Sequence, residues 1–213
     1  LETQVTKSYI SFDGDPVFIG AMRDLILGDA VPSARVAGVG AVGGTSALRQ
    51  VLELVRMLRP SARVWVSDPS WPIHAAMVDH LGLARGTYRY LDRGSNGLDR
   101  EGMLAYLSRA GPGDVIVLHG CCHNPTGADL GPRDWAEVAA VCNRTGAIPL
   151  VDMAYQGFGD GLVEDASGVR LLAREVPTVF VAASCSKNFG LYRDRAGVAL
   201  IVTSEGAIGA VQG

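Results

Sequence analysis

The sequence predicts an α/β fold in which helices cover both faces of a mostly parallel, mixed sheet, giving three layers in the order α/β/α. Its 213 residues, 48% hydrophobic and 19% charged, are enough to bury a large core within one domain spanning residues 1–213. Short apolar runs rich in β-branched residues alternate with segments of helical periodicity. The runs are apolar at nearly every position, as in strands that are covered on both faces.

The first predicted elements lie between residues 45 and 83. Residues 45–59 are predicted to form a helix, because apolar side chains recur along one face and Pro60 ends the pattern. The run "ARVWVSD" at residues 62–68 predicts a strand. The segment "PIHAAMVDHLGL" that follows predicts a helix with Pro72 in its first turn.

The same alternation continues to the end of the chain. Strands are expected at residues 114–120, 147–153, 177–184 and 197–203. Helices are expected at residues 132–146, where Gly146 supplies a C-terminal cap, and near residues 164–175. This order of elements favours parallel strands joined by helical crossovers.

Charge and composition exclude several classes of partner. The formal net charge of -3 gives no basic surface for nucleic acid or an anionic membrane. No apolar run reaches the roughly 20 residues of a membrane span, and no signal peptide is evident. The four cysteines match neither a disulfide framework nor a zinc site, so reduced thiols and a soluble, cytoplasmic protein are expected.

Reactive side chains gather directly after the predicted strands. In a sheet of this kind, ligands bind beyond the carboxyl ends of the strands. The segments found there are Gly43–Thr45, Asp68–Trp71, His119–Asn124, Asp152–Tyr155 and Ser184–Lys187. A binding site is therefore predicted at this edge.

The glycines of "GVGAVGG" allow two functional interpretations. Gly38, Gly40 and Gly43 match G-x-G-x-x-G between a strand-like run and a helix, and Asp68 ends the next strand, as in a dinucleotide-binding fingerprint. Bare N–H groups at a helix start hold any phosphate equally well. A tight turn without a ligand is the third possibility.

Lys187 also has alternatives. Ser184 and Lys187 form S-x-x-K, the motif of a serine acyl-transferase, but the companion S-D-N and K-T-G motifs do not occur. A lysine at a strand end is otherwise either a surface lysine or, where it is nearly buried, a nucleophile toward carbonyls. Arg195 and Ser184 are candidate phosphate ligands, whereas Arg193 and Asp194 read as a solvated turn.

Two further residues have both a structural and a functional interpretation. Asp152 is either a turn aspartate or a carboxylate that needs a cationic partner, with Tyr155 beside it as a phenol donor. Asn124 in "HNPTG" belongs to a turn by composition, yet its amide can donate to an anionic oxygen.

One cofactor accounts for these residues together. Pyridoxal phosphate needs a lysine for its aldehyde and an acidic partner for its ring nitrogen, which Lys187 and Asp152 supply. Asn124 and Tyr155 suit its ring hydroxyl, and Trp71 suits its ring face. The glycine turn, with serine and arginine, suits its phosphate.

The chain also resembles a known family. The motifs "VGGTSALR", "DPSWPIH", "LHGCCHNPTGADL", "VDMAYQGFGDG" and "SCSKNFGLYRDRAG" occur in the order found in the aspartate and aromatic amino acid aminotransferases. These are fold-type-I enzymes that use pyridoxal phosphate. The resemblance implies a large cofactor-binding domain and transfer of an amino group between an aspartate-like or aromatic amino acid and a 2-oxo acid.

The resemblance implies a role for each matched residue. Lys187 forms a Schiff base with the cofactor and moves a proton at the substrate α-carbon. Asp152, supported by His74, keeps the ring nitrogen protonated, while Tyr155 and Asn124 bind the ring oxygen and Trp71 lies on the ring. The implied phosphate ligands are Gly44, Thr45, Ser184, Arg195 and, from the neighbouring subunit of a homodimer, Tyr9. His119 and His123 are implied either as packing groups or as groups that support the cofactor ligands from behind.

Departures from the family pattern bear on the amino-transfer activity that the resemblance implies. Ser46 stands where the family usually has glycine, a change expected to be tolerated. The N-terminal arm and the C-terminal small domain, which carries the arginine for the substrate carboxylate, are expected to be missing. The alternatives are therefore a non-catalytic or incomplete cofactor-binding or dimerising chain, or a nicotinamide-dinucleotide-binding dehydrogenase domain.

Overall fold

A seven-stranded mixed sheet forms the centre of the molecule in the computed structural model, which describes residue 8 and residues 11–212. The strand order is β1-β9-β8-β7-β6-β2-β3. Only β9 runs against the others, because it pairs antiparallel with both β1 and β8. The strands are β1 (Val36–Val42), β2 (Arg63–Asp68), β3 (Ala84–Arg89), β6 (Val115–His119), β7 (Ile148–Met153), β8 (Val179–Ser184) and β9 (Ala196–Val202).

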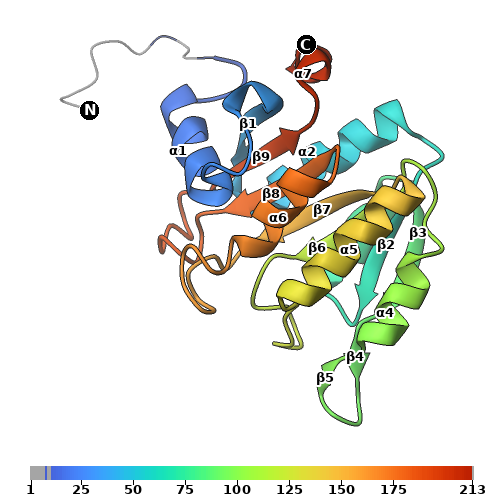
Figure 1. The fold of residues 1–213 in the computed structure, drawn as a ribbon. Coiled ribbons are helices and arrows are strands. Elements are labelled where there is room, and N and C mark those ends of the chain that lie inside the picture. Colours follow the sequence, from blue (N-terminus) through green and yellow to red (C-terminus); the bar gives the residue numbers. More distant parts are fainter. Residues whose placement is uncertain (1–7, 9–10, 213) are drawn as a thin grey trace.

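Helices cover both faces of this sheet, which confirms the predicted three-layer α/β fold (Figure 1). The apolar faces of α2 (Gly43–Leu58) and α3 (Pro72–His80) pack on one side. On the other side lie α1 (Pro16–Leu27), α4 (Arg100–Leu107), α5 (Pro132–Thr145) and α6 (Ser167–Glu175). The short α7 (Glu205–Gln212) lies beside β1.

Each central strand contributes side chains to two hydrophobic cores, one on each face of the sheet, because successive side chains of a strand point to opposite faces. In β7, Leu150 joins the core under α2 and α3, whereas Val151 joins the core under α5 and α6. Both residues are fully buried. The same alternation places Asp152 on the face that α2 and α3 cover, which brings its carboxylate toward the N-terminal ends of those helices.

The nine helices and strands for which the sequence predicted bounds are all present within a few residues of those bounds. Elements not predicted are α1, α4, α7, the edge strand β3, the hairpin of β4 (Leu91–Asp92) and β5 (Gly97–Leu98), and the short 3-10 helix η1 (Ser33–Arg35). Among the described residues, no helix combines the length and the apolar character that crossing a membrane requires.

Candidate active site

A cavity of about 240 Å³ opens at the carboxyl ends of the parallel strands. The loops after β1, β2, β6, β7 and β8 all reach it, together with the residue that precedes β9. Predicted site residues that line it are Gly44, Thr45, Trp71, Asn124, Asp152, Tyr155, Ser184, Lys187 and Arg195. His74 contacts Asp152 from behind, and Tyr9 lies outside the described residues.

The buried carboxylate of Asp152 is held by a histidine. His74 Nε2 lies 2.8 Å from Asp152 Oδ2, and both side chains are almost fully buried. Pro72 starts α3 and Trp71 is its N-cap, so the first turn of the helix aims His74 at the end of β7. Since an ionised carboxylate only accepts hydrogen bonds, the Nε2–H group of His74 donates to it.

The hydrogen-bond chain continues through Ser70 to His119, which also lines the cavity. Ser70 Oγ lies 3.0 Å from His74 Nδ1 and 3.2 Å from His119 Nε2. Burial, with the nearby His123 and His74, lowers the pKa of His119 to about 2, so His119 is neutral. When the Ser70 hydroxyl donates to His74 Nδ1, the Nε2–H of His119 donates to Ser70 Oγ. This chain fixes the orientation of the ring that contacts Asp152.

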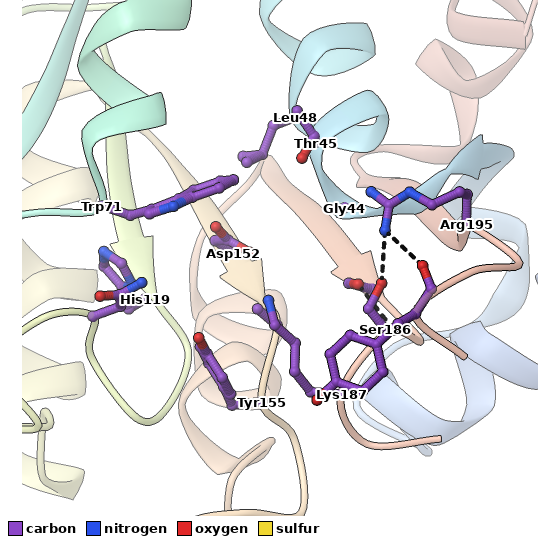
Figure 2. A pocket seen from close by; sticks show the side chains of 14 residues that line it. Gly44, Thr45, Leu48, Trp71, His119, Asp152, Tyr155, Ser186, Lys187 and Arg195 are labelled. Atoms are coloured by element: carbon purple, nitrogen blue, oxygen red, sulfur yellow. Dashed lines mark hydrogen bonds between the residues drawn. The ribbon is translucent and has the colours of Figure 1, made fainter. Parts of the chain in front are cut away.

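Lys187 follows β8 and extends into the cavity. Its Nζ lies 4.7 Å from the centre of the Tyr155 ring, within the range of a cation–π contact. Figure 2 shows the amine pointing toward Asp152, with the Tyr155 hydroxyl and the Trp71 indole on the same side of the cavity. An amine, a phenol and a carboxylate therefore converge on one space.

The start of α2 and the Arg195 side chain form the opposite wall. Arg195 Nη1 lies 3.2 Å from Ser186 Oγ (Figure 2). Gly43 has a φ of +75°, and a Cβ there would lie 2.6 Å from Arg195 Nη2. At Gly44 a Cβ would lie 2.9 Å from Ser184 Cβ. Both glycines are needed for the guanidinium and the serine to approach the free N–H groups of the helix start.

These residues fit pyridoxal phosphate by the chemistry of their groups. The helix start, a guanidinium and two serines form a site for a phosphate. A buried carboxylate with its own histidine suits a protonated ring nitrogen, and a lysine amine suits an aldehyde. Because Gly43 and Gly44 have no side chains, Arg195 and Ser184 can lie close to the start of α2 and leave space there for an anion.

The dinucleotide interpretation of the glycines does not fit the structure. Gly38 and Gly40 lie inside β1 and do not belong to the strand-to-helix turn. A Cβ at Gly38 would lie 2.6 Å from Ile19, and one at Gly40 would lie 3.3 Å from the Asp13 carbonyl. Each glycine therefore lets a neighbouring segment pack closely against β1. In addition, β1 and β2 are far apart in the sheet, whereas they are neighbours in a dinucleotide-binding fold.

Sequence reasoning missed some residues of the cavity. Ser186 binds Arg195 and immediately precedes Lys187, a position that could have marked it. Ser70 does not line the cavity but links two histidines beside it. It occurs within "DPSW", and nothing in the sequence pairs it with them. Leu48 and Tyr192 also line the cavity, and their residue types alone carry no signal.

A family model described as "Aminotransferase class I and II" matches residues 1–211. The chain belongs to this family. An aromatic-amino-acid aminotransferase of Paracoccus denitrificans is 55% identical over 207 residues, which are 97% of this chain and 52% of that relative. An aspartate aminotransferase of Haemophilus influenzae is 41% identical over 210 residues, covering 97% of this chain and 53% of that relative.

Solved structures of the family have the same fold. An aromatic amino acid aminotransferase with 3-indolebutyric acid has a TM-score of 0.97 at 53% identity, over 99% of this chain and 54% of that one. An aromatic-amino-acid aminotransferase from Burkholderia pseudomallei, described as covalently bound to pyridoxal phosphate, has a TM-score of 0.94 at 41% identity, over the same shares of the two chains. The chain thus spans about half the length of the relatives it matches.

Proposed function

We propose that residues 1–213 are the cofactor-binding domain of a pyridoxal-phosphate-dependent aminotransferase that moves an amino group between an amino acid and a 2-oxo acid. One observation supports this most strongly. Lys187, the His74-bound carboxylate of Asp152, the start of α2 and Arg195 meet at a single cavity. Pyridoxal phosphate supplies an aldehyde that combines with amino groups and a ring that withdraws electrons from the α-carbon.

Lys187 has two roles in this proposal. Its Nζ would hold the cofactor covalently through the aldehyde and would be freed when a substrate amine binds. The freed amine would then act as base and acid for the proton of the substrate α-carbon. The support is its position: Nζ lies 4.7 Å from the Tyr155 ring centre, at the floor of the cavity.

The remaining ring ligands act by holding charge and orientation. Asp152 keeps a proton on the ring nitrogen, and His74 fixes that carboxylate at 2.8 Å. Tyr155 and Asn124 would donate hydrogen bonds to the ring oxygen, and Trp71 would pack against the ring. Donors placed before the reaction begins stabilise developing charge without reorganising.

The phosphate is held by the N–H groups of Gly44 and Thr45, by Ser184 and by the guanidinium of Arg195. Tyr9 of a second subunit completes this site in the proposal, which makes the protein a homodimer. A cytoplasmic location fits the reduced cysteines, all of which are free in the described residues.

The favoured amino donors are aromatic amino acids, with aspartate-like donors second. The support is the ranking of relatives: the one named for aromatic amino acids is 55% identical and the one named for aspartate is 41% identical. Structures that match at a TM-score of 0.97 contain indole carboxylic acids, which resemble an aromatic substrate that lacks its amino group.

A half-reaction tests this proposal. Purified protein loaded with pyridoxal phosphate is mixed with phenylalanine, tyrosine or aspartate alone, and the 2-oxo acid released per bound cofactor is measured. We expect stoichiometric release, fastest with the aromatic donors, and none from Lys187→Ala. Cofactor binding without release from any of the donors would favour a non-catalytic cofactor-binding protein.

A further inference from the structure

Asn124 lies in the cavity wall without a hydrogen-bond partner for its side chain among the described residues. Its amide is therefore free for a ligand, and its position depends on the backbone that carries it. That backbone is the turn of residues 120–130, which links β6 to α5. The turn begins where Gly120 N–H donates to the Asp152 carbonyl at 2.9 Å.

Asp129 ties the two ends of this turn together. Its Oδ2 accepts from the N–H of Cys122 and its Oδ1 from the N–H of His123, each at 2.7 Å. Cys122 has a φ of +50°, a conformation disfavoured for a residue with a Cβ. The two hydrogen bonds hold this conformation in the residues immediately before Asn124.

His123 anchors the turn from the inside. Its Nε2 lies 3.1 Å from Ser67 Oγ at the end of β2, and its Nδ1 lies 2.8 Å from Thr126 Oγ1 in the turn itself. The Tyr90 ring stacks on it with 3.9 Å between ring centres. Tyr90 also donates to the Ala128 carbonyl at 2.6 Å. The ring of His123 is therefore fixed on both nitrogens and on one face.

We propose that Asp129 and His123 are positioning residues that hold the side-chain amide of Asn124 at the oxygen of the ligand in the cavity. Neither side chain lines the cavity, so each acts through the backbone of the turn. The inference rests on the proposed function for the identity of that ligand, whose ring oxygen is the acceptor. It assigns Asp129 and His123 a role separate from packing.

The test uses the visible absorbance of the bound cofactor as a function of pH. A donor to the ring oxygen lowers the basicity of the adjoining nitrogen that joins the cofactor to Lys187, so losing the donor raises the pH midpoint. We expect Asn124→Ala to raise it by about one pH unit. Asp129→Asn, which puts a donor against one of the two N–H groups, should raise it by about half as much.

A double variant separates positioning from a general effect. If Asp129 acts through Asn124, then Asp129→Asn adds nothing to the midpoint in the Asn124→Ala background. The matched control is Asp92→Asn, since Asp92 is also exposed and accepts from a backbone N–H and a serine hydroxyl in a distant hairpin. The control should leave the midpoint unchanged.

Two outcomes for Asp129→Asn would count against its positioning role. Additive shifts of the two substitutions, or an unshifted midpoint in Asp129→Asn, would overturn the inference. Thr126→Val provides a second approach, because it removes the 2.8 Å contact to His123 and should shift the midpoint in the same direction. If the unsubstituted protein develops no cofactor absorbance at all, the proposed function fails, whatever the role of the turn.

Discussion

A substitution at Gly43 tests how Arg195 is held beside the start of α2. Alanine there would meet two separate obstacles, the positive φ of the backbone and the Arg195 guanidinium. The residue has a φ of +75°, and a Cβ there would lie 2.6 Å from Arg195 Nη2. Gly82 has a φ of +69° with nothing within 4 Å of its Cβ position. Alanine at either site meets the same backbone strain, but only at Gly43 does it displace the guanidinium.

The expected magnitudes follow from these contacts. The left-handed conformation costs an alanine about 1–2 kcal/mol, so both variants should lose that much unfolding free energy. Displacing Arg195 removes charge-assisted hydrogen bonds worth about 1.5–3 kcal/mol. Gly43→Ala should therefore weaken binding of pyridoxal phosphate by about 10- to 150-fold, while Gly82→Ala leaves binding unchanged.

Two measurements on the same pair of variants check this prediction. Urea unfolding gives the loss of stability, and a titration of apo-protein with pyridoxal phosphate gives the dissociation constant. Equal dissociation constants for Gly43→Ala and Gly82→Ala would refute the reasoning, because the guanidinium would then not need the space that glycine leaves.

Further predictions concern buried polar groups. Burial holds the pKa of His123 at about 4 in the folded protein, against about 6.5 in the unfolded chain, so the unfolded chain binds more protons below pH 6.5. The unfolding free energy should therefore fall by about 1.6 kcal/mol between pH 6.5 and pH 5 because of His123. Urea unfolding should show a smaller loss in His123→Gln. Asp165 accepts three backbone N–H groups in the loop after Tyr155, at 2.7 to 3.0 Å. Asp165→Ala should lower the unfolding free energy by about 2–4 kcal/mol, and an unchanged urea midpoint would count against that role. Asp152→Asn should weaken amino transfer, measured as 2-oxo acid release, far more than it weakens cofactor binding, since only the carboxylate keeps the ring nitrogen protonated. Comparable losses of release and of binding would argue against this.

The sequence predicted the central strands well because their burial leaves an unmistakable pattern. Strand β8 is buried at every position, and the residues of its predicted segment are apolar almost throughout. Strand β3 was missed because it lies at the edge, where only Gly86 and Tyr88 are buried. Helix α1 could have been found, since Asp15 caps it and Pro16 is its first residue.

The position of the site was predictable for a topological reason. Within the seven-stranded sheet, all strands except β9 run the same way, so the segments after them meet at one edge. Arg195 joins them because β9 runs in the opposite direction and begins at that edge. That reversal is set by pairing with β1 and β8, which no local pattern encodes. The roles of these residues stay predictions, and Tyr9 lies outside the described residues.

Hydrogen bonds between distant side chains were the least predictable part. Ser70 and His119, 49 residues apart, were not paired by the sequence. The contact of His74 with Asp152, 78 residues away, was expected only from the family resemblance. Their contacts exist because the carboxyl ends of β6 and β7 lie beside the segment that follows β2 in the folded sheet. A sequence indicates that each residue is polar and near a strand end, but the pairing arises only from the order of the strands.

The central claim, a covalent bond between Lys187 and pyridoxal phosphate, can be measured directly. The protein is incubated with pyridoxal phosphate, reduced with borohydride and digested, and the peptides are analysed by mass spectrometry. The account predicts a pyridoxyl group on Lys187 that is lost in Lys187→Ala. A folded protein that carries no adduct at Lys187, or carries it on another lysine, would contradict the account.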